Sequence, residues 1–130
     1  MDREELVGRL FRAYKARDLD EARRLVAPDV RIEPLSTALL PGRRPYEGID
    51  GLGEWFGDLA RSGYEFDAAI DSIEVQGDRA LVAGVLRTTS AHEWASSTSV
   101  AWVFEFDPED RLRSMRAFLS VDEAREWMTA

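Results

Sequence analysis

The chain has 130 residues, of which 45% are hydrophobic and 32% charged, and it contains no cysteine. This composition indicates one soluble, globular domain over residues 1–130 and excludes disulfides, thiolate metal ligands and a cysteine nucleophile. A formal net charge of −8 argues against nucleic acid and anionic membranes as partners. The N-terminus lacks the basic start and apolar centre of a signal peptide, so we expect a cytoplasmic protein.

Two amphipathic helices are expected at the start of the chain. Over residues 3–16 the apolar side chains recur at the spacing of one helical face, and Asp2 is a suitable N-cap. A shorter helix over residues 19–26 follows Asp18, which caps it in the same way. Pro28 ends this second helix.

A strand, a loop and a third helix are expected next. Residues 29–35 are predicted to form a short strand. Residues 40–51 contain two prolines and three glycines, which indicates a loop, and we expect it to lie over the mouth of a pocket. Helical spacing resumes over residues 51–61, with Trp55 on the apolar face.

The second half of the chain consists mainly of strand-like runs, predicted at residues 64–76, 79–90, 97–106 and 111–119. Residues 76–78 join the first two as a tight hairpin, and residues 107–110 join the last two. Residues 121–128 form a final helical segment. Helices first and strands second indicate an α+β fold, with helices packed on one face of a mostly antiparallel sheet.

This order of elements resembles the nuclear transport factor 2-like superfamily, in particular its SnoaL-like and ketosteroid-isomerase-like branch. The likeness rests on LFRAYKARDLDEARRLVAPDVRIEP (10–34), YEGIDGLGEWFGDL (46–59) and DRLRSMRAFLSVDEAREWM (110–128), which are diffuse motifs. It implies a single SnoaL-like domain, a cone in which the N-terminal helices close the concave face of a strongly bent sheet. The family includes isomerases, cyclases, epoxide hydrolases and non-catalytic binding domains, so the resemblance implies a fold and not one reaction.

Both faces of the predicted sheet are largely apolar, whereas a sheet with one wet face alternates polar and apolar residues. No helix is left over to cover the convex face. We therefore predict a homodimer that buries this face through Leu86, Ala101, Val103 and Phe118.

Alignment with the isomerase pattern implies that Val85, Trp102, Met115 and Ala117 point into the cone, with Arg87 on the same face as Val85. Tyr14 and Trp55 offer aromatic rings for a flat apolar ligand and complete the predicted ligand-binding pocket. The alternative for the aromatic residues is that they are simply core.

The ketosteroid isomerases use a carboxylate base and two oxyanion donors, a Tyr and a protonated Asp. The resemblance matches Glu33, directly before a proline, to the base. It places Trp102 at the Asp position and Leu10 at the Tyr position, with Tyr14 one turn later. Because two of the three groups are missing or displaced, we do not expect ketosteroid isomerisation.

Three residues are candidates for catalysis. Glu33 is either a pocket base or a solvated strand carboxylate. Arg87 either pairs with a carboxylate such as Glu33, points a free guanidinium at a ligand, or reaches solvent at the rim. His92, the only histidine, is either an acid/base group or a surface residue. One histidine and no carboxylate cluster of suitable spacing lead us to expect no metal and no cofactor.

The sequence thus predicts a pocket for a small, largely apolar molecule. If the protein is an enzyme, the reaction class is cofactor-free proton transfer or water addition, with Glu33 or His92 as base and Arg87 or Tyr14 polarising an oxygen. The alternative is a non-catalytic ligand-binding or dimerisation domain.

Overall fold

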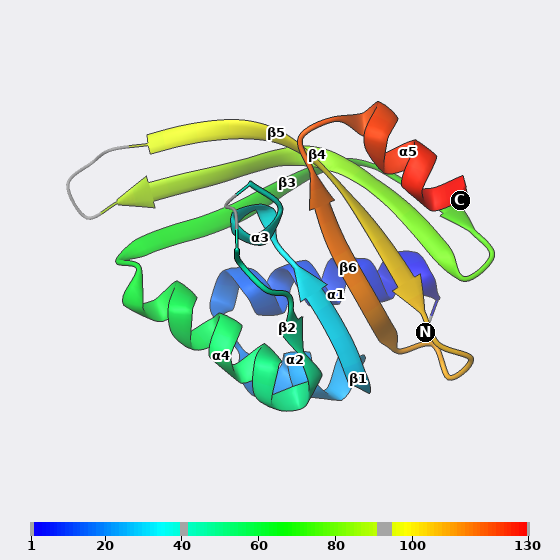
Figure 1. Ribbon diagram of the computed structural model, residues 1–130, viewed down its shortest axis with the longest axis horizontal. Coiled ribbons are helices and arrows are strands. Elements are labelled where there is room, and N and C mark those ends of the chain that lie inside the picture. Colours follow the sequence, from blue (N-terminus) through cyan, green and yellow to red (C-terminus); the bar gives the residue numbers. More distant parts are fainter. Residues whose placement is uncertain (1, 40–41, 91–94, 130) are drawn as a thin grey trace.

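The computed structural model describes residues 2–39, 42–90 and 95–129, and within them the chain forms a curled sheet with helices on both faces (Figure 1). The helices are α1 (Arg3–Ala16), α2 (Leu19–Leu25), α3 (Leu35–Leu39), α4 (Gly48–Arg61) and α5 (Val121–Thr129). The strands are β1 (Val26–Glu33), β2 (Tyr46–Glu47), β3 (Tyr64–Gln76), β4 (Arg79–Ser90), β5 (Ala95–Phe106) and β6 (Leu112–Phe118).

The sheet has the strand order β2-β1-β6-β5-β4-β3, and every neighbouring pair is antiparallel except β1 with β6. Helices α1, α2 and α4 lie under the concave face, whereas α5 lies on the convex face (Figure 1). The predicted α+β fold with N-terminal helices on the concave face is therefore confirmed. No helix in the described part of the chain is long and apolar enough to cross a membrane.

The predicted helix caps are present. The Asp2 carboxylate accepts a hydrogen bond from the Glu5 backbone N–H at 2.7 Å, and Asp18 accepts one from that of Glu21 at 3.1 Å. The start of β1 differs from the prediction, because Val26 already pairs with Leu112 of β6. This pairing buries Val26, so tertiary contact ends α2 before the proline does.

The bend of the sheet depends on a bulge in the edge strand. The pairing of β3 with β4 shifts between Ile70 and Ser72, which leaves Asp71 as the extra residue. Gly84 faces this bulge, and a Cβ atom there would overlap the carbonyl oxygen of Ala69. Only glycine lets the two backbones approach this closely.

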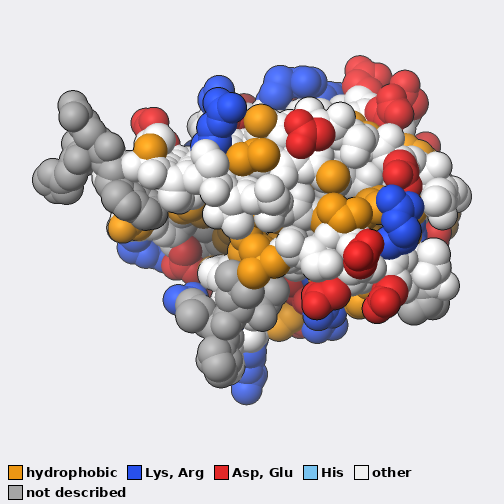
Figure 2. All heavy atoms as spheres, turned by 90° about the horizontal axis from the view of Figure 1, so that it is seen from above, with side chains coloured by type: hydrophobic (Ala, Val, Ile, Leu, Met, Phe, Trp, Pro, Cys, Tyr) orange, Lys and Arg blue, Asp and Glu red, His pale blue; other side chains and the backbone are white. Residues whose placement is uncertain are grey.

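The convex face of the sheet carries a small core of its own, which the sequence did not predict. Leu81, Ala101, Val103 and Phe118 are buried there beneath Ala124, Trp127 and Met128. Seen from this side, hydrophobic side chains form small, separate patches (Figure 2). The argument that only a second copy could cover Ala101, Val103 and Phe118 is therefore wrong, since α5 covers them. The homodimer itself stays a prediction, which sedimentation equilibrium tests.

The predicted facing of β4 is also wrong, by one residue. Val82 pairs with Trp102 and Leu86 with Thr98, so the even-numbered residues of β4 share the concave face with Trp102. Val85 and Arg87 therefore lie on the convex face, and Leu86 lies on the concave one. Both sets of β4 residues are largely apolar, so alternation alone did not settle which set the helices cover.

Candidate functional site

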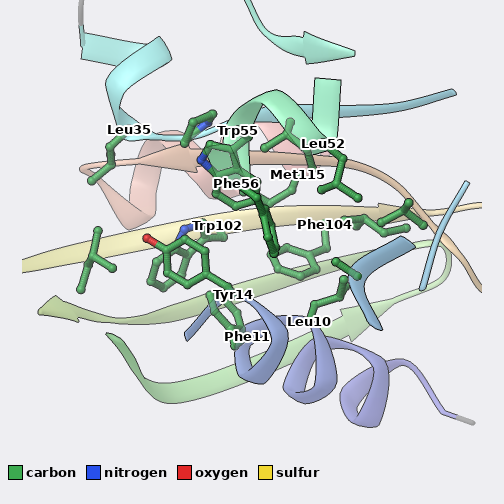
Figure 3. Close-up of a pocket in the computed structure, with 16 residues that line it drawn as sticks. Leu10, Phe11, Tyr14, Leu35, Leu52, Trp55, Phe56, Trp102, Phe104 and Met115 are labelled. Atoms are coloured by element: carbon green, nitrogen blue, oxygen red, sulfur yellow. The ribbon is translucent and has the colours of Figure 1, made fainter. Parts of the chain in front are cut away.

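A cavity lies between the helices and the concave face of the sheet, and we call it the concave cavity (Figure 3). Its lining residues are Leu10, Phe11, Tyr14, Ala22, Val26, Ile32, Pro34, Leu35, Leu52, Trp55, Phe56, Leu86, Trp102, Phe104, Leu112 and Met115. Its volume is about 70 Å³, on a measure by which one water molecule needs about 10–15 Å³. The concave cavity thus has room for several waters or a small organic molecule.

Helical and strand periodicity explain why these residues meet. Helix α1 contributes Leu10, Phe11 and Tyr14 at positions i, i+1 and i+4, and α4 contributes Leu52, Trp55 and Phe56 at positions i, i+3 and i+4. Such spacing places three side chains on one helical face. The strands contribute alternate residues, such as Trp102 and Phe104 of β5.

Flat aromatic surfaces form much of the lining. The rings of Tyr14 and Trp55 stack with centroids 5.3 Å apart and an interplanar angle of 22°. Trp102 meets the ring of Phe11 edge to face, at 5.0 Å and 69°. Rigid aromatic walls of this kind suit a planar apolar ligand.

The lining residues carry three polar side-chain atoms, namely the Tyr14 hydroxyl oxygen and the indole nitrogens of Trp55 and Trp102. Burial raises the pKa of the Tyr14 hydroxyl well above its ordinary value of 10.0, and the charge of Arg17 opposes this only in part. Tyr14 therefore stays protonated at neutral pH and acts as a hydrogen-bond donor rather than a base. The lining that the structure describes contains no carboxylate, imidazole, amine or guanidinium group.

Four of the six predicted pocket residues line the concave cavity: Tyr14, Trp55, Trp102 and Met115. Ala117 pairs with Trp102 and is buried on the concave face, but it does not line the cavity. Val85 is on the other face. The sequence analysis missed the other lining residues. Those in α1 and α4 could have been predicted from their helical periodicity.

The structure does not place Glu33 in the concave cavity. Val30 and Ile32 point inward and are 0% and 1% exposed, and Glu33 lies on the convex side. There its carboxylate contacts Nε of Arg31 at 2.9 Å and Nε of Arg116 at 3.3 Å. The prediction of Glu33 as a pocket base is therefore wrong, because the strand presents the opposite set of side chains.

Arg87 also lies outside the concave cavity. It is exposed on the convex side, opposite Asp67 in the pairing of β3 with β4. Of its three predicted roles, a contact with Glu33 and a free guanidinium aimed at a ligand in the pocket are wrong, and Arg87 reaches solvent. His92 lies outside the described residues, and β4, the strand before it, ends at Ser90.

Comparison with known proteins places this geometry in a family. The family model of the SnoaL-like domain matches residues 7–115. No curated protein gives a match.

Solved structures of other proteins show the same fold. An NTF2-like protein of unknown function from Burkholderia pseudomallei is 22% identical, with a TM-score of 0.75 and full coverage of both chains. TerC, co-crystallised with polyporic acid, is 17% identical over 98% of each chain, with a TM-score of 0.75. SalBIII, an epoxide hydrolase/cyclase-like enzyme of pyran ring formation in salinomycin, is 22% identical over 89% of this chain and 88% of its own, with a TM-score of 0.73. The chain belongs to the SnoaL-like family of the nuclear transport factor 2-like superfamily.

Proposed function

We propose that this protein binds a small, largely apolar molecule in the concave cavity. The observation that carries the proposal is a cavity of about 70 Å³ that is lined by apolar and aromatic side chains. A core selected only for stability fills such space, since protein interiors are close-packed.

The structural neighbours support the same proposal. TerC was crystallised with polyporic acid, and SalBIII is described as an epoxide hydrolase/cyclase-like enzyme. Those properties belong to those proteins, whose identity to this chain is too low to carry over a ligand. Their shared fold makes a small organic molecule the first ligand class to test here.

The test is a calorimetric or NMR titration with ethylbenzene, an apolar probe of suitable size. Wild-type protein should bind it, and Leu86→Phe should weaken binding at least about tenfold, because the larger ring fills the concave cavity. Val85→Phe is the matched control, since it adds an aromatic ring at the next residue on the opposite face and should leave the affinity within about twofold. Equal effects of the two variants, or no binding by the wild type, would contradict the proposal.

A second candidate function is cofactor-free catalysis, for which the protonated Tyr14 hydroxyl is the supporting observation. It can donate a hydrogen bond to an epoxide or carbonyl oxygen as negative charge develops there. The base must then come from outside the described lining, and we propose His92 for it. Ser90 is the last described residue before His92. It lies four residues beyond Leu86 of the cavity lining, which corresponds to about 13 Å along β4.

This candidate is tested by incubation with styrene oxide and analysis of the diol product. Turnover that is lost in both Tyr14→Phe and His92→Gln would support catalysis with these two groups. Turnover that survives in His92→Gln would remove His92 as the base. No turnover by wild-type protein that binds ethylbenzene would leave ligand binding as the function.

A further inference from the structure

A second hollow, which we call the convex groove, lies on the convex side of the sheet and has a volume of about 420 Å³. Its lining comes from β1, β5 and β6 and from Trp127 of α5. Strands β1 and β6 lie side by side as a parallel pair (Figure 1), in which Arg31 is the partner of Ser114 and Glu33 the partner of Arg116. These four side chains therefore share one face and meet in the convex groove.

Arg116 is held by its surroundings, yet it donates no hydrogen bond to a described residue. Its guanidinium carbon lies 5.2 Å from the centre of the Phe118 ring and 5.7 Å from that of Trp127. Its Nε atom is buried without a hydrogen-bond partner, because Oε2 of Glu33, 3.3 Å away, forms an ion pair outside hydrogen-bond geometry. An arginine carries five N–H donors, so this one is positioned for an acceptor that the described chain does not supply.

One carboxylate is shared by two arginines. Glu33 contacts Nε of Arg31 through one oxygen and Nε of Arg116 through the other. The terminal nitrogens of both guanidinium groups donate no hydrogen bond within the described ranges. Arg113, the extra residue at the bulge of β6, has no ion pair or hydrogen bond there either. Three guanidinium groups of the lining are thus available to an anion.

The convex groove is positively charged, although the chain as a whole carries a net charge of −8. Three arginines and three carboxylates line it. One of these carboxylates, Glu105, lies 3.8 Å from Nε of a fourth arginine, Arg79. Another, Asp29, is exposed, so that water and salt screen its charge. An anion in the groove therefore meets an excess of positive charge.

We infer that the convex groove binds a phosphate group, either as the free ion or as the end of a small phosphate ester, between Arg31, Arg113 and Arg116. Guanidinium groups bind phosphate oxygens with pairs of charge-assisted hydrogen bonds. A carboxylate fills one such fork, whereas the oxygens of a phosphate reach more than one arginine. This site is independent of the proposed function, because it needs no ligand in the concave cavity.

The experiment is an NMR titration at pH 6.5 with inorganic phosphate and, separately, with phenyl phosphate. It follows the Nε–H signals of the arginines, and sodium chloride at matched ionic strength measures the effect of salt alone. At least one of the two phosphates should shift the signals of Arg31, Arg113 and Arg116 in a saturable manner, whereas sodium chloride should not. Binding of phenyl phosphate alone would identify the ester as the ligand, and equal binding of both would identify the phosphate group itself.

The test variant is Arg113→Gln, and its matched control is Arg12→Gln. Arg12 is an exposed arginine of α1, outside the groove, which likewise has no ion pair or hydrogen bond with a described residue. Both changes remove one positive charge. Arg113→Gln should weaken phosphate binding at least about fivefold, the effect of one lost hydrogen bond to a charged group. Arg12→Gln should leave the affinity within about twofold. Arg116 is left unchanged, because its ring contact with Trp127 also holds α5.

Equal weakening in the two variants would overturn the inference, since it would show that only overall charge attracts the anion. Shifts that do not saturate, or that sodium chloride reproduces, would overturn it as well. Thermal melts of each variant confirm that the fold is kept. Ethylbenzene binding does not enter this test, so its failure would leave the proposed function standing.

Discussion

Asp107 is the one charged residue that is buried in the part of the chain that the structure describes, with only 5% of it exposed. Its carboxylate accepts hydrogen bonds from the backbone N–H groups of Glu109 and Arg111, at 3.0 and 2.9 Å, and from Nε of Arg111 at 2.9 Å. Burial opposes its ionisation, but these hydrogen bonds and the Arg111 charge outweigh burial and hold the pKa of Asp107 below its ordinary range. Asp107 thereby fixes the turn between β5 and β6.

Asp107→Asn should destabilise the protein by about 1–2 kcal/mol at pH 7, because the amide cannot replace the carboxylate in all three bonds. A lowered folded-state pKa adds stability above the ordinary value near 3.8, and this stability is lost as the pH falls through the lower value. The difference between wild type and variant should therefore shrink below about pH 4. Urea unfolding at pH 7 and pH 3 measures it, and a pH-independent difference would contradict this account.

At the scale of single residues, the sequence predicted the aromatic lining better than the charged candidates. Tyr14 and Trp55 follow from helical spacing, which the helices obey. Val85, Arg87 and Glu33 depended on strand parity, where a shift of one residue moves a side chain to the other face. The face of the sheet that a side chain occupies depends on how its strand pairs with the neighbouring strands. The sequence of one strand alone does not contain that information.

At the scale of secondary-structure elements, α5 is held on the convex face by a chain of charged and aromatic contacts. The guanidinium groups of Arg79 and Arg116 lie 5.6 and 5.7 Å from the centre of the Trp127 ring. Nη1 of Arg79 also donates to the carbonyl of Met128 at 2.8 Å. The carbonyl groups at the C-terminal end of a helix carry partial negative charge, so the positive charge of Arg79 at this end stabilises α5.

Trp127→Ala should therefore cost about 2–4 kcal/mol, less than a fully buried tryptophan because Trp127 is partly exposed. Affinity for a ligand of the concave cavity should not change, since α5 lies on the opposite face of the sheet. Chemical denaturation and ethylbenzene titration of the same variant measure both quantities. A parallel loss of stability and affinity would show that the two faces are coupled.

The bulge in β3 gives a second prediction for an element. Gly84→Ala should destabilise the protein by about 1–3 kcal/mol, because the new methyl group meets the backbone of Ala69, which cannot move aside cheaply. Gly53→Ala is the matched control: its nearest neighbour is the Leu19 side chain at 3.9 Å, so better helix propensity should stabilise α4 by about 0.5–1 kcal/mol. Urea midpoints compare the two variants, and equal shifts would argue against the close approach.

The sequence predicted the existence of α5 but not its position. Its apolar residues mark it as amphipathic, yet the face that it covers depends on the turn after β6 and on contacts with Arg79 and Arg116, far away in sequence. The end of α2 shows the same limit, since pairing of Val26 with β6 moves the boundary. Caps are local, and those of α1 and α2 were predicted correctly.

At the scale of the whole molecule, the sheet separates two environments. The concave side holds the larger core, the aromatic rings and the unfilled volume, whereas the convex side holds α5 and the ion pairs of Glu33 with Arg31 and Arg116. The order of helices and strands was enough to predict the mostly antiparallel sheet with the N-terminal helices on its concave face. It was not enough to predict which residues reach the concave cavity, because that depends on strand register.

The central claim is that a small, largely apolar molecule binds in the concave cavity. Its most direct test is an NMR measurement of nuclear Overhauser effects between ethylbenzene and the methyl groups of the protein. The account predicts contacts from the ligand to Met115 and Leu86, and none to Val85 on the opposite face. Contacts confined to Val85 and its convex neighbours, or no contacts at saturating ethylbenzene, would contradict it.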